Sequence, residues 1–201
     1  MTFGFDEEFE RQEKMQKIRR LTIKIIKWSI AVIVAVGLAY FITAFCVEKT
    51  NMVGDSMMST LNNDDIILIN SLAYWKSTPE RFDVIVFEKN GKEHKYMSIK
   101  RVIGLPGETV QIIDGNIYIN GEYLPENNNV EPMKIAGLAE KPLKLDEDEY
   151  FVLGDNRNNS EDSRFNTVGN VSLSEIRGRA MFRLNGFGII SKMNLKKDEQ
   201  E

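Results

Sequence analysis

Three segments of this 201-residue sequence place serine, lysine and carboxylate side chains among apolar residues. They are residues 53–61 (VGDSMMSTL), 99–108 (IKRVIGLPGE) and 152–164 (VLGDNRNNSEDSR). A serine hydroxyl is a weak nucleophile until a base removes its proton. A lysine can be that base if burial lowers the pKa of its amine. Ser56 and Lys100 are therefore candidates for hydrolytic chemistry, beside the alternative that they belong to an ordinary turn and an ordinary strand.

The scarcity of cysteine and histidine argues against several other kinds of catalytic site. The only cysteine, Cys46, lies in an apolar stretch, and the only histidine, His94, lies in a polar segment typical of a solvated hairpin turn. One residue of each type cannot build a zinc site from several Cys or His ligands. The acidic run at residues 146–149 lacks the spacing of a calcium loop. We expect no metal and no other cofactor.

One stretch of the sequence has the length and composition of a membrane span. Residues 28–47 contain no charged side chain and are rich in Ile, Val, Ala and Phe. As a helix they would be roughly 30 Å long, about the thickness of a bilayer's hydrocarbon core. A secretory signal usually has a shorter core followed by a small-residue cleavage site, and a soluble core helix is rarely apolar on every face. We therefore predict a transmembrane helix over residues 28–47.

Basic residues are distributed unequally on the two sides of this predicted helix. Residues 14–27 contain six Lys or Arg, whereas the fifteen residues after position 47 contain only Lys49. The positive-inside rule then predicts a cytoplasmic tail of residues 1–27 and an extracytoplasmic domain of residues 48–201. Because that domain has 25 acidic and 19 basic residues, we expect no nucleic acid partner.

Beyond the predicted helix, the sequence has the pattern of a mostly β, antiparallel domain. Short runs rich in Ile and Val, bounded by Gly, Asn, Asp or Pro, predict strands at residues 66–69, 83–87, 109–113, 116–119 and 150–153. Asp114-Gly115 and Asn120-Gly121 are typical of hairpin turns. We expect one short capped helix over residues 172–179 and a long loop over residues 125–144.

The three polar segments together resemble motifs of the bacterial type I signal peptidases. That family has a Ser-Met motif just after its membrane anchor, followed by an Arg-Gly-Asp-Ile-Val-Val-Phe-like strand. A Lys-Arg-Val-Ile-Gly-Leu-Pro-Gly-Asp motif and a Gly-Asp-Asn-Arg-x-x-Ser-x-Asp-Ser-Arg motif come next. Counterparts of all four lie in this order between residues 53 and 164, and the last is matched at every fixed position. The resemblance implies a membrane-bound serine endopeptidase with an antiparallel β-sheet catalytic domain, which cleaves signal peptides from exported preproteins at Ala-x-Ala-like sites.

The resemblance also implies roles for individual residues. Ser56 would be the nucleophile, and its backbone N–H would help to stabilise the oxyanion. Lys100 would be the general base of a Ser-Lys dyad, and Ser160 would hydrogen-bond the Lys100 amine and orient it. Asp162 and Arg164 would form an ion pair that braces the site.

Further residues would support the same site or bind the substrate. Asp155 and Arg157 are the remaining supporting residues of this hypothesis. An extended substrate would add a strand between residues 52–55 and 97–99, where shallow apolar pockets would accept alanine-sized side chains. The expected substrate-binding residues are Met52, Val53, Gly54, Asp55, Met97, Ser98 and Ile99.

Three positions depart from the family pattern. Some members have a serine two places before the nucleophile that serves as an oxyanion donor, and this chain has Gly54 there. Ser59 stands where the family usually has proline, and Phe82 replaces the glycine of Arg-Gly-Asp. We expect these changes to affect turn geometry and pocket walls rather than activity.

The resemblance places the protein in a bacterial cell membrane, with a single span and the catalytic domain outside the cell. Its expected partners are exported preproteins and the lipid bilayer, and a contact of residues 125–144 with the secretion translocase is left open. Two alternatives remain. A membrane-tethered relative of the self-cleaving SOS repressors would share Gly-Asp-Ser-Met and a lysine base, but not the long motif ending at Arg164. A pilus-assembly chaperone without peptidase activity would have lost Ser56 or Lys100, and both are present.

Overall fold

The computed structural model describes residues 3–45, 47–90, 95–126 and 131–190. The predicted turn that contains His94 lies outside the described residues. The chain divides into two compact units, a helical one at Met1–Phe45 and a β-rich one at Cys46–Glu201.

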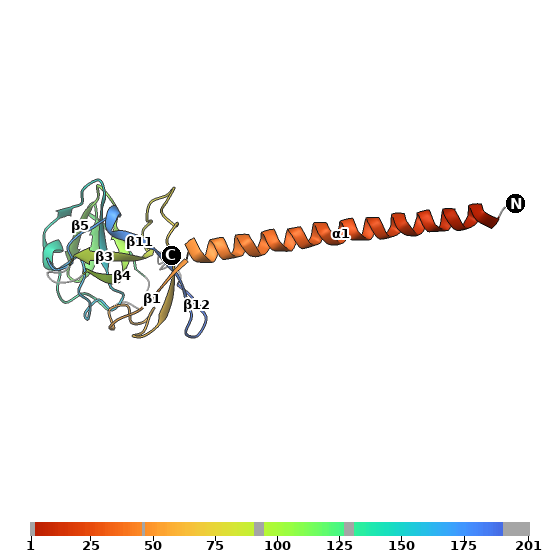
Figure 1. Ribbon diagram of the computed structural model, residues 1–201. Coiled ribbons are helices and arrows are strands. Elements are labelled where there is room, and N and C mark those ends of the chain that lie inside the picture. Colours follow the sequence, from red (N-terminus) through yellow and green to blue (C-terminus); the bar gives the residue numbers. More distant parts are fainter. Residues whose placement is uncertain (1–2, 46, 91–94, 127–130, 191–201) are drawn as a thin grey trace, which may run out of the picture. The chain divides into compact units, whose positions relative to one another are not determined.

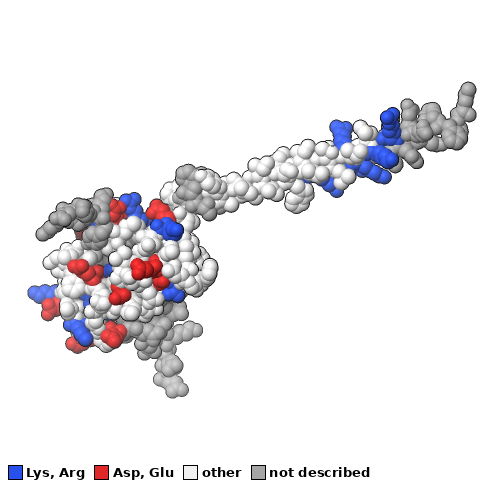
Figure 2. Space-filling view, turned by 60° about the horizontal axis from the view of Figure 1, so that its bottom comes forward, with Lys and Arg blue, Asp and Glu red and all other residues white. Residues whose placement is uncertain are grey.

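The N-terminal unit is a single helix, α1 (Phe3–Phe45), of 43 residues (Figure 1). Lys14–Tyr40 within it is long and apolar enough, by length and composition, to cross a membrane. Its Lys and Arg side chains lie toward the N-terminal half, and an uncharged stretch follows them (Figure 2). The large apolar side chains described along it are exposed, as suits a helix covered by lipid, so α1 indicates a membrane anchor.

This helix differs from the prediction at both ends. It begins at Phe3 because the residues before Trp28 are rich in Glu, Gln, Lys and Arg, which are favourable in helices. It ends at Phe45, and strand β1 (Val47–Asn51) begins two residues later. Val47 pairs with Asn70, so this residue belongs to the sheet rather than to the helix.

The described residues of the second unit form short strands joined by turns and two 3₁₀-helices (Figure 1). The 3₁₀-helices are η1 (Gly137–Glu140) and η2 (Leu173–Glu175). After β1, the strands are β2 (Ile66–Asn70), β3 (Val84–Asn90), β4 (Lys95–Gly104), β5 (Thr109–Ile113), β6 (Asn116–Ile119), β7 (Glu122–Tyr123), β8 (Leu143–Lys144), β9 (Glu149–Leu153), β10 (Val171–Ser172), β11 (Ile176–Arg183) and β12 (Gly188–Ile189).

These strands form two sheets, in which neighbouring strands pair antiparallel. The larger sheet has the order β1-β2-β11-β3-β4-β9-β10, with β12 paired to β11. The smaller sheet has the order β7-β6-β5-β8. The predicted fold class, mostly antiparallel β with one N-terminal apolar helix, is confirmed, and so are the five predicted strands.

Three clusters of buried apolar side chains hold this unit together, and β4 contributes to all of them. Ile99 packs in the cluster that contains Met57. Val102 packs in a second cluster with Ile85. Ile103 belongs to the third cluster, which includes the buried residues of the smaller sheet. Strand β4 is therefore the element on which the three cores meet.

The two predicted hairpin turns are present. Asp114 and Gly115 have φ values of 49° and 79°, and Asn120 and Gly121 have φ values of 53° and 86°. Positive φ at both central residues is the requirement of a type I′ turn, and Asn, Asp and Gly meet it at least cost. The turns join β5 to β6 and β6 to β7.

The predicted helix over residues 172–179 is wrong beyond its first turn. Ser172 caps η2, and its side chain forms a capping box with Glu175. From Ile176 the chain becomes β11, which pairs with both β2 and β3. A helix of two turns is marginal in isolation, and hydrogen bonds to two neighbouring strands outweigh it. The predicted loop over residues 125–144 contains η1 and β8 among its described residues.

Candidate active site

The candidate catalytic side chains meet where β9 ends beside β4. The last residue of β9, Leu153, is opposite Arg101. Lys100, the residue before Arg101, is therefore the first β4 residue that is not paired with β9. Two loops, residues 52–61 and 154–164, contact each other at this end of the sheet.

The loop that carries Ser56 is anchored by two side chains. Met57 and Leu61 are fully buried in the cluster that also contains Ile99, and burial of such a side chain stabilises a fold by about 1.5–3 kcal/mol. The Met57 carbonyl accepts hydrogen bonds from Thr60 N and Leu61 N at 2.9 and 2.8 Å. Ser56, directly before this turn, is thus held on a rigid support while remaining half-buried.

The side chains of Ser56 and Lys100 are in direct contact. Lys100 Nζ and Ser56 Oγ are 2.8 Å apart, within hydrogen-bond distance. Only 6% of Lys100 is exposed, and this burial lowers its pKa from the ordinary 10.5, although the charges of Asp162, Glu161 and Asp155 act in the opposite direction. In its neutral form the amine can accept the hydroxyl proton across this contact.

The backbone of Ser56 is fixed by the second loop. Asn156 N donates to the Ser56 carbonyl at 3.0 Å, and Asn156 Nδ2 donates to the Asp55 carbonyl at 3.0 Å. Gly154 approaches so closely that a Cβ at this position would overlap the Ser56 carbonyl oxygen and Ser160 Oγ. Within the described part of the chain, Ser56 N–H donates to no acceptor, which leaves it available to an oxyanion.

The structure joins Asp162 and Arg164 in a buried ion pair. Arg164 Nε and Nη2 donate to the two oxygens of Asp162 at 2.8 and 2.9 Å, and the side chains are 0% and 2% exposed. Gly154 N donates to Asp162 Oδ2 at 3.2 Å. Arg164 also bonds the carbonyls of Ile135 and Arg157. The pair therefore connects the two ends of the 154–164 loop, including Gly154, which contacts the nucleophile's backbone.

The hydrogen bond expected between Ser160 and Lys100 is absent. Ser160 Oγ is buried without a hydrogen-bond partner among the residues the structure describes. The Lys100 amine is engaged by Ser56 instead, while Ser160 Oγ lies against the Gly154 backbone. The expectation that Ser160 orients the lysine through a hydrogen bond is thus wrong for this structure.

Asp155 has partners that sequence reasoning missed. Arg101 Nε and Nη2 donate to its two oxygens at 2.7 and 2.6 Å, in a pair that is almost fully buried. Thr60 Oγ1 donates to Asp155 Oδ2 at 2.5 Å, and Arg101 Nη1 donates to the Phe82 carbonyl. This network links β4, next to Lys100, to both loops of the site.

Arg157 does not pair with Asp155. Its guanidinium forms a bidentate ion pair with Glu126, and its Nε donates to the Gly154 carbonyl at 3.0 Å. Glu126 lies at the start of the predicted long loop, in a context without a recognisable motif. The pair attaches this loop to the site.

The expected substrate-binding residues divide into buried and exposed ones. Met52 and Ile99 are 2% and 5% exposed and pack in the cluster below the site. The Met52 N–H and carbonyl bond to Asp65 and Asp64, so Met52 supports the loop. Val53 and Met97 are 84% and 46% exposed. The others are exposed or half-buried: Gly54, Asp55 and Ser98.

All three departures from the family pattern have positive φ. The values are 80° for Gly54, 88° for Ser59 and 68° for Phe82. Proline cannot adopt the backbone of Ser59, because its ring holds φ near −65°. At Phe82 a glycine would have no steric penalty, whereas the phenylalanine is strained but 5% exposed and packed in a core. All three departures from the family pattern therefore occur where the backbone has a left-handed conformation.

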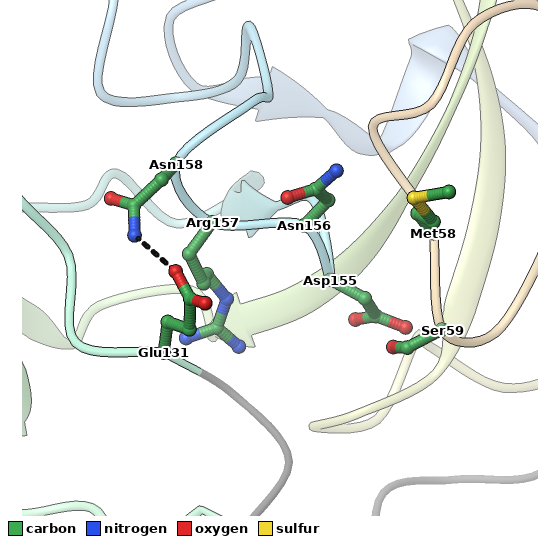
Figure 3. Close-up of a pocket in the computed structure, with 7 residues that line it drawn as sticks. All are labelled: Met58, Ser59, Glu131, Asp155, Asn156, Arg157 and Asn158. Carbon is green, nitrogen blue, oxygen red and sulfur yellow. Dashed lines mark hydrogen bonds between the residues drawn. The ribbon is translucent and has the colours of Figure 1, made fainter.

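A cavity of about 210 Å³ lies beside the nucleophile loop (Figure 3). Ser56 and Lys100 are not among its lining residues. Three segments line it: Met58 and Ser59 after the nucleophile, residues 155–158 of the second loop, and Glu131 of the long loop. In Figure 3 the Glu131 carboxylate reaches Asn158.

Comparisons with known proteins agree on one family. A family model described as "Signal peptidase, peptidase S26" matches residues 25–185. The chain is 36% identical over 169 residues to "Signal peptidase I P" of Bacillus subtilis subsp. natto, covering 81% of this chain and 90% of that protein. It is 35% identical to "Signal peptidase I S" of Bacillus subtilis (strain 168), covering 85% and 94%. A crystal structure of a signal peptidase I from Enterococcus faecalis covers 51% of this chain and 97% of that one, at 34% identity and a TM-score of 0.39.

Proposed function

The chain belongs to the signal peptidase family, peptidase S26, and on that premise we propose that Ser56 and Lys100 are the dyad with which it cleaves signal peptides. Membership makes the protein a serine endopeptidase that processes signal peptides of preproteins. The single observation that carries the residue assignment is the 2.8 Å contact of Lys100 Nζ with Ser56 Oγ.

In the proposed reaction, neutral Lys100 takes the Ser56 proton as Oγ attacks the carbonyl carbon of the scissile bond. The Ser56 N–H donates to the oxygen that becomes negatively charged. When the C–N bond breaks, the Lys100 ammonium gives its proton to the departing amine. A water molecule then attacks the acyl-enzyme, Lys100 accepts its proton, and that proton returns to Ser56 Oγ.

The surrounding residues support this assignment through electrostatics and rigidity. Burial of Lys100 favours the neutral amine that the first step requires. The Asp162–Arg164 pair is a brace rather than a proton shuttle, because both groups are held by hydrogen bonds in their charged forms. The Arg101–Asp155 pair holds β4 to the second loop, which preserves the separation of nucleophile and base.

We propose that the substrate binds as an extended strand between residues 52–55 and 97–99, with small side chains at an Ala-x-Ala-like site. Residues 97–99 belong to the part of β4 beyond the cover of β9, and Val53 is exposed on the other side. Met52 and Ile99 are both buried in one apolar cluster, and in this proposal they limit the depth available to the substrate's side chains.

The proposed topology is a single-pass protein of the bacterial cell membrane, with residues 1–27 in the cytoplasm, a span within α1, and the catalytic domain of residues 48–201 outside. The charge asymmetry around the apolar part of α1 supports this orientation. Ser56 lies eleven residues after the end of α1, and the proposal requires that a signal peptide still in the bilayer reach it. A contact with the secretion translocase through residues 125–144 is part of the same proposal.

The test is cleavage of a purified preprotein by the full-length protein in detergent. We expect wild type and the exposed-serine control Ser77→Ala to release the mature protein. Ser56→Ala should lose activity by at least about 10³-fold while keeping its thermal midpoint, because the nucleophile is gone. Normal cleavage by Ser56→Ala would overturn the assignment, and binding of pilin without cleavage by wild type would favour the chaperone alternative.

A further inference from the structure

The cavity beside the nucleophile loop is a candidate site for the departing half of the substrate. The proposed acyl half lies along residues 52–55, before Ser56. The cavity is lined by Met58 and Ser59, after Ser56. In the proposed binding mode, an extended peptide with its scissile carbonyl at Ser56 would continue past the nucleophile toward the cavity.

Asn156 connects the cavity to the reacting centre. Its side-chain amide and backbone N–H hold the carbonyls of Asp55 and Ser56, and it also lines the cavity (Figure 3). Asn156 thus contacts both the nucleophile loop and the cavity.

The size of the cavity suits a side chain. At about 210 Å³ it is smaller than the roughly 300–1,000 Å³ of sites that hold a separate small molecule. Its lining of serine, asparagine and charged groups, with one methionine, suits a long polar side chain better than an apolar one.

The charges that line the cavity leave an excess negative charge. Asp155 is neutralised by Arg101, and Arg157 by Glu126. Among the described residues, Glu131 forms no ion pair and accepts only a long hydrogen bond of 3.3 Å from Asn158 Nδ2. The exposed Glu131 carboxylate therefore remains available to a cation.

We propose that this cavity binds a side chain from the first residues of the mature protein, and that Glu131 favours a basic side chain there over an acidic one. The proposal rests on the proposed function, since only cleavage at Ser56 brings those residues to the cavity. The enzyme would then recognise residues on both sides of the cleaved bond: small residues before it, and a basic residue after it, in the mature protein.

The test uses synthetic peptides with one Ala-x-Ala cleavage site and either Lys or Glu at the first, second or third position after it. We expect wild type to show a two- to fivefold higher kcat/KM for Lys than for Glu at one of these positions, the size of a solvated ion pair. Glu131→Gln should abolish this preference, and Glu131→Lys should reverse it. The control Glu147→Gln removes an exposed carboxylate that does not line the cavity and should preserve the preference.

The outcomes separate the inference from the function on which it rests. Equal cleavage of Lys and Glu peptides by wild type would overturn the cavity's role and leave the dyad intact. A preference that persists unchanged in Glu131→Gln would also overturn it. No cleavage of any peptide by wild type would instead contradict the proposed function.

Discussion

Lys100 Nζ lies 2.8 Å from Ser56 Oγ, although the two residues are 44 positions apart in the chain. One comes from the middle of a central strand and the other from a loop anchored by Met57. The contact is made where the lysine is buried and its pKa is lowered. Proximity and a lowered pKa are the two conditions under which a lysine can act as a general base.

The pH dependence of the rate tests this base. Only neutral Lys100 can accept the Ser56 proton, so we expect kcat/KM to rise with pH through the pKa of Lys100 in the free enzyme. Because burial lowers this pKa, the inflection should lie below 10.5. The measurement is a pH–rate profile of wild type beside His94→Ala. Loss of the inflection in a folded His94→Ala protein would transfer the role of base to the histidine.

The same lysine links stability to pH. Its pKa is lower in the folded protein than the ordinary 10.5 of an unfolded chain, so the unfolded state binds more protons between the two values. The free energy of unfolding should therefore rise with pH through this window from the Lys100 contribution. We expect Lys100→Met to lose this contribution and to lose at least about 100-fold in kcat/KM. Urea unfolding of both proteins across pH measures the difference, and identical pH dependence would contradict the assigned pKa shift.

Asp162→Asn should weaken the fold and also shift the rate profile. Removing one charge of a buried ion pair costs about 3 kcal/mol, and Arg164 would lose its partner. The Asp162 charge raises the pKa of Lys100, so its removal should move the inflection of kcat/KM to lower pH. A purely structural brace would leave the inflection in place. Asp146→Asn, at an exposed position, serves as the control for both measurements.

Gly154→Ala should damage catalysis more than folding. The added methyl would overlap the Ser56 carbonyl and Ser160 Oγ, so the nucleophile must move. A displacement of about 1 Å can reduce a rate by 10²-fold, and we expect at least a tenfold lower kcat/KM. Gly188→Ala meets only the flexible end of Arg183 and should be active. An active Gly154→Ala enzyme would show that the loop tolerates displacement.

The proposed orientation predicts protease sensitivity of the large domain. When protease is added to intact protoplasts, we expect residues 48–201 to be degraded and the α1 segment to remain with the membrane. Lysed protoplasts control for the intrinsic resistance of the folded domain. Protection of the domain in intact cells would reverse the topology and remove the access to signal peptides.

Local sequence patterns were sufficient to predict five strands and two hairpin turns of the β-rich unit, but not β4, on which the three cores meet. Asp and Gly adopt positive φ at low energetic cost, and Asp114 and Gly115 do so here. These two residues therefore determine the hairpin. Strand β1 was missed because its sequence, VEKTN, has little apolar character and its sheet position is an edge. Strand β11 was missed because Ser172 and Glu175 do form the expected cap, and only pairing with distant strands ends the helix.

The sequence indicated which side chains lie at the candidate site, but not all of the contacts that they make. Ser56 and Lys100 were identified by residue type and by resemblance, and the structure brings them together. The partnership of Arg101 with Asp155 spans 54 residues, and that of Thr60 with Asp155 spans 95. Such pairs depend on how the loops meet after folding, which no local pattern encodes. The same dependence explains why Ser160 was assigned a hydrogen bond that it does not make.

The meeting of three cores on β4 has a consequence for the lifetime of the active enzyme. Ile99, Val102 and Ile103 each belong to a different cluster, so disruption of any cluster withdraws support from the strand that carries Lys100. Partial opening of this unit therefore moves Lys100 away from Ser56. Activity and tertiary structure should disappear together in one cooperative transition, so the half-life of the active enzyme should equal that of the folded domain.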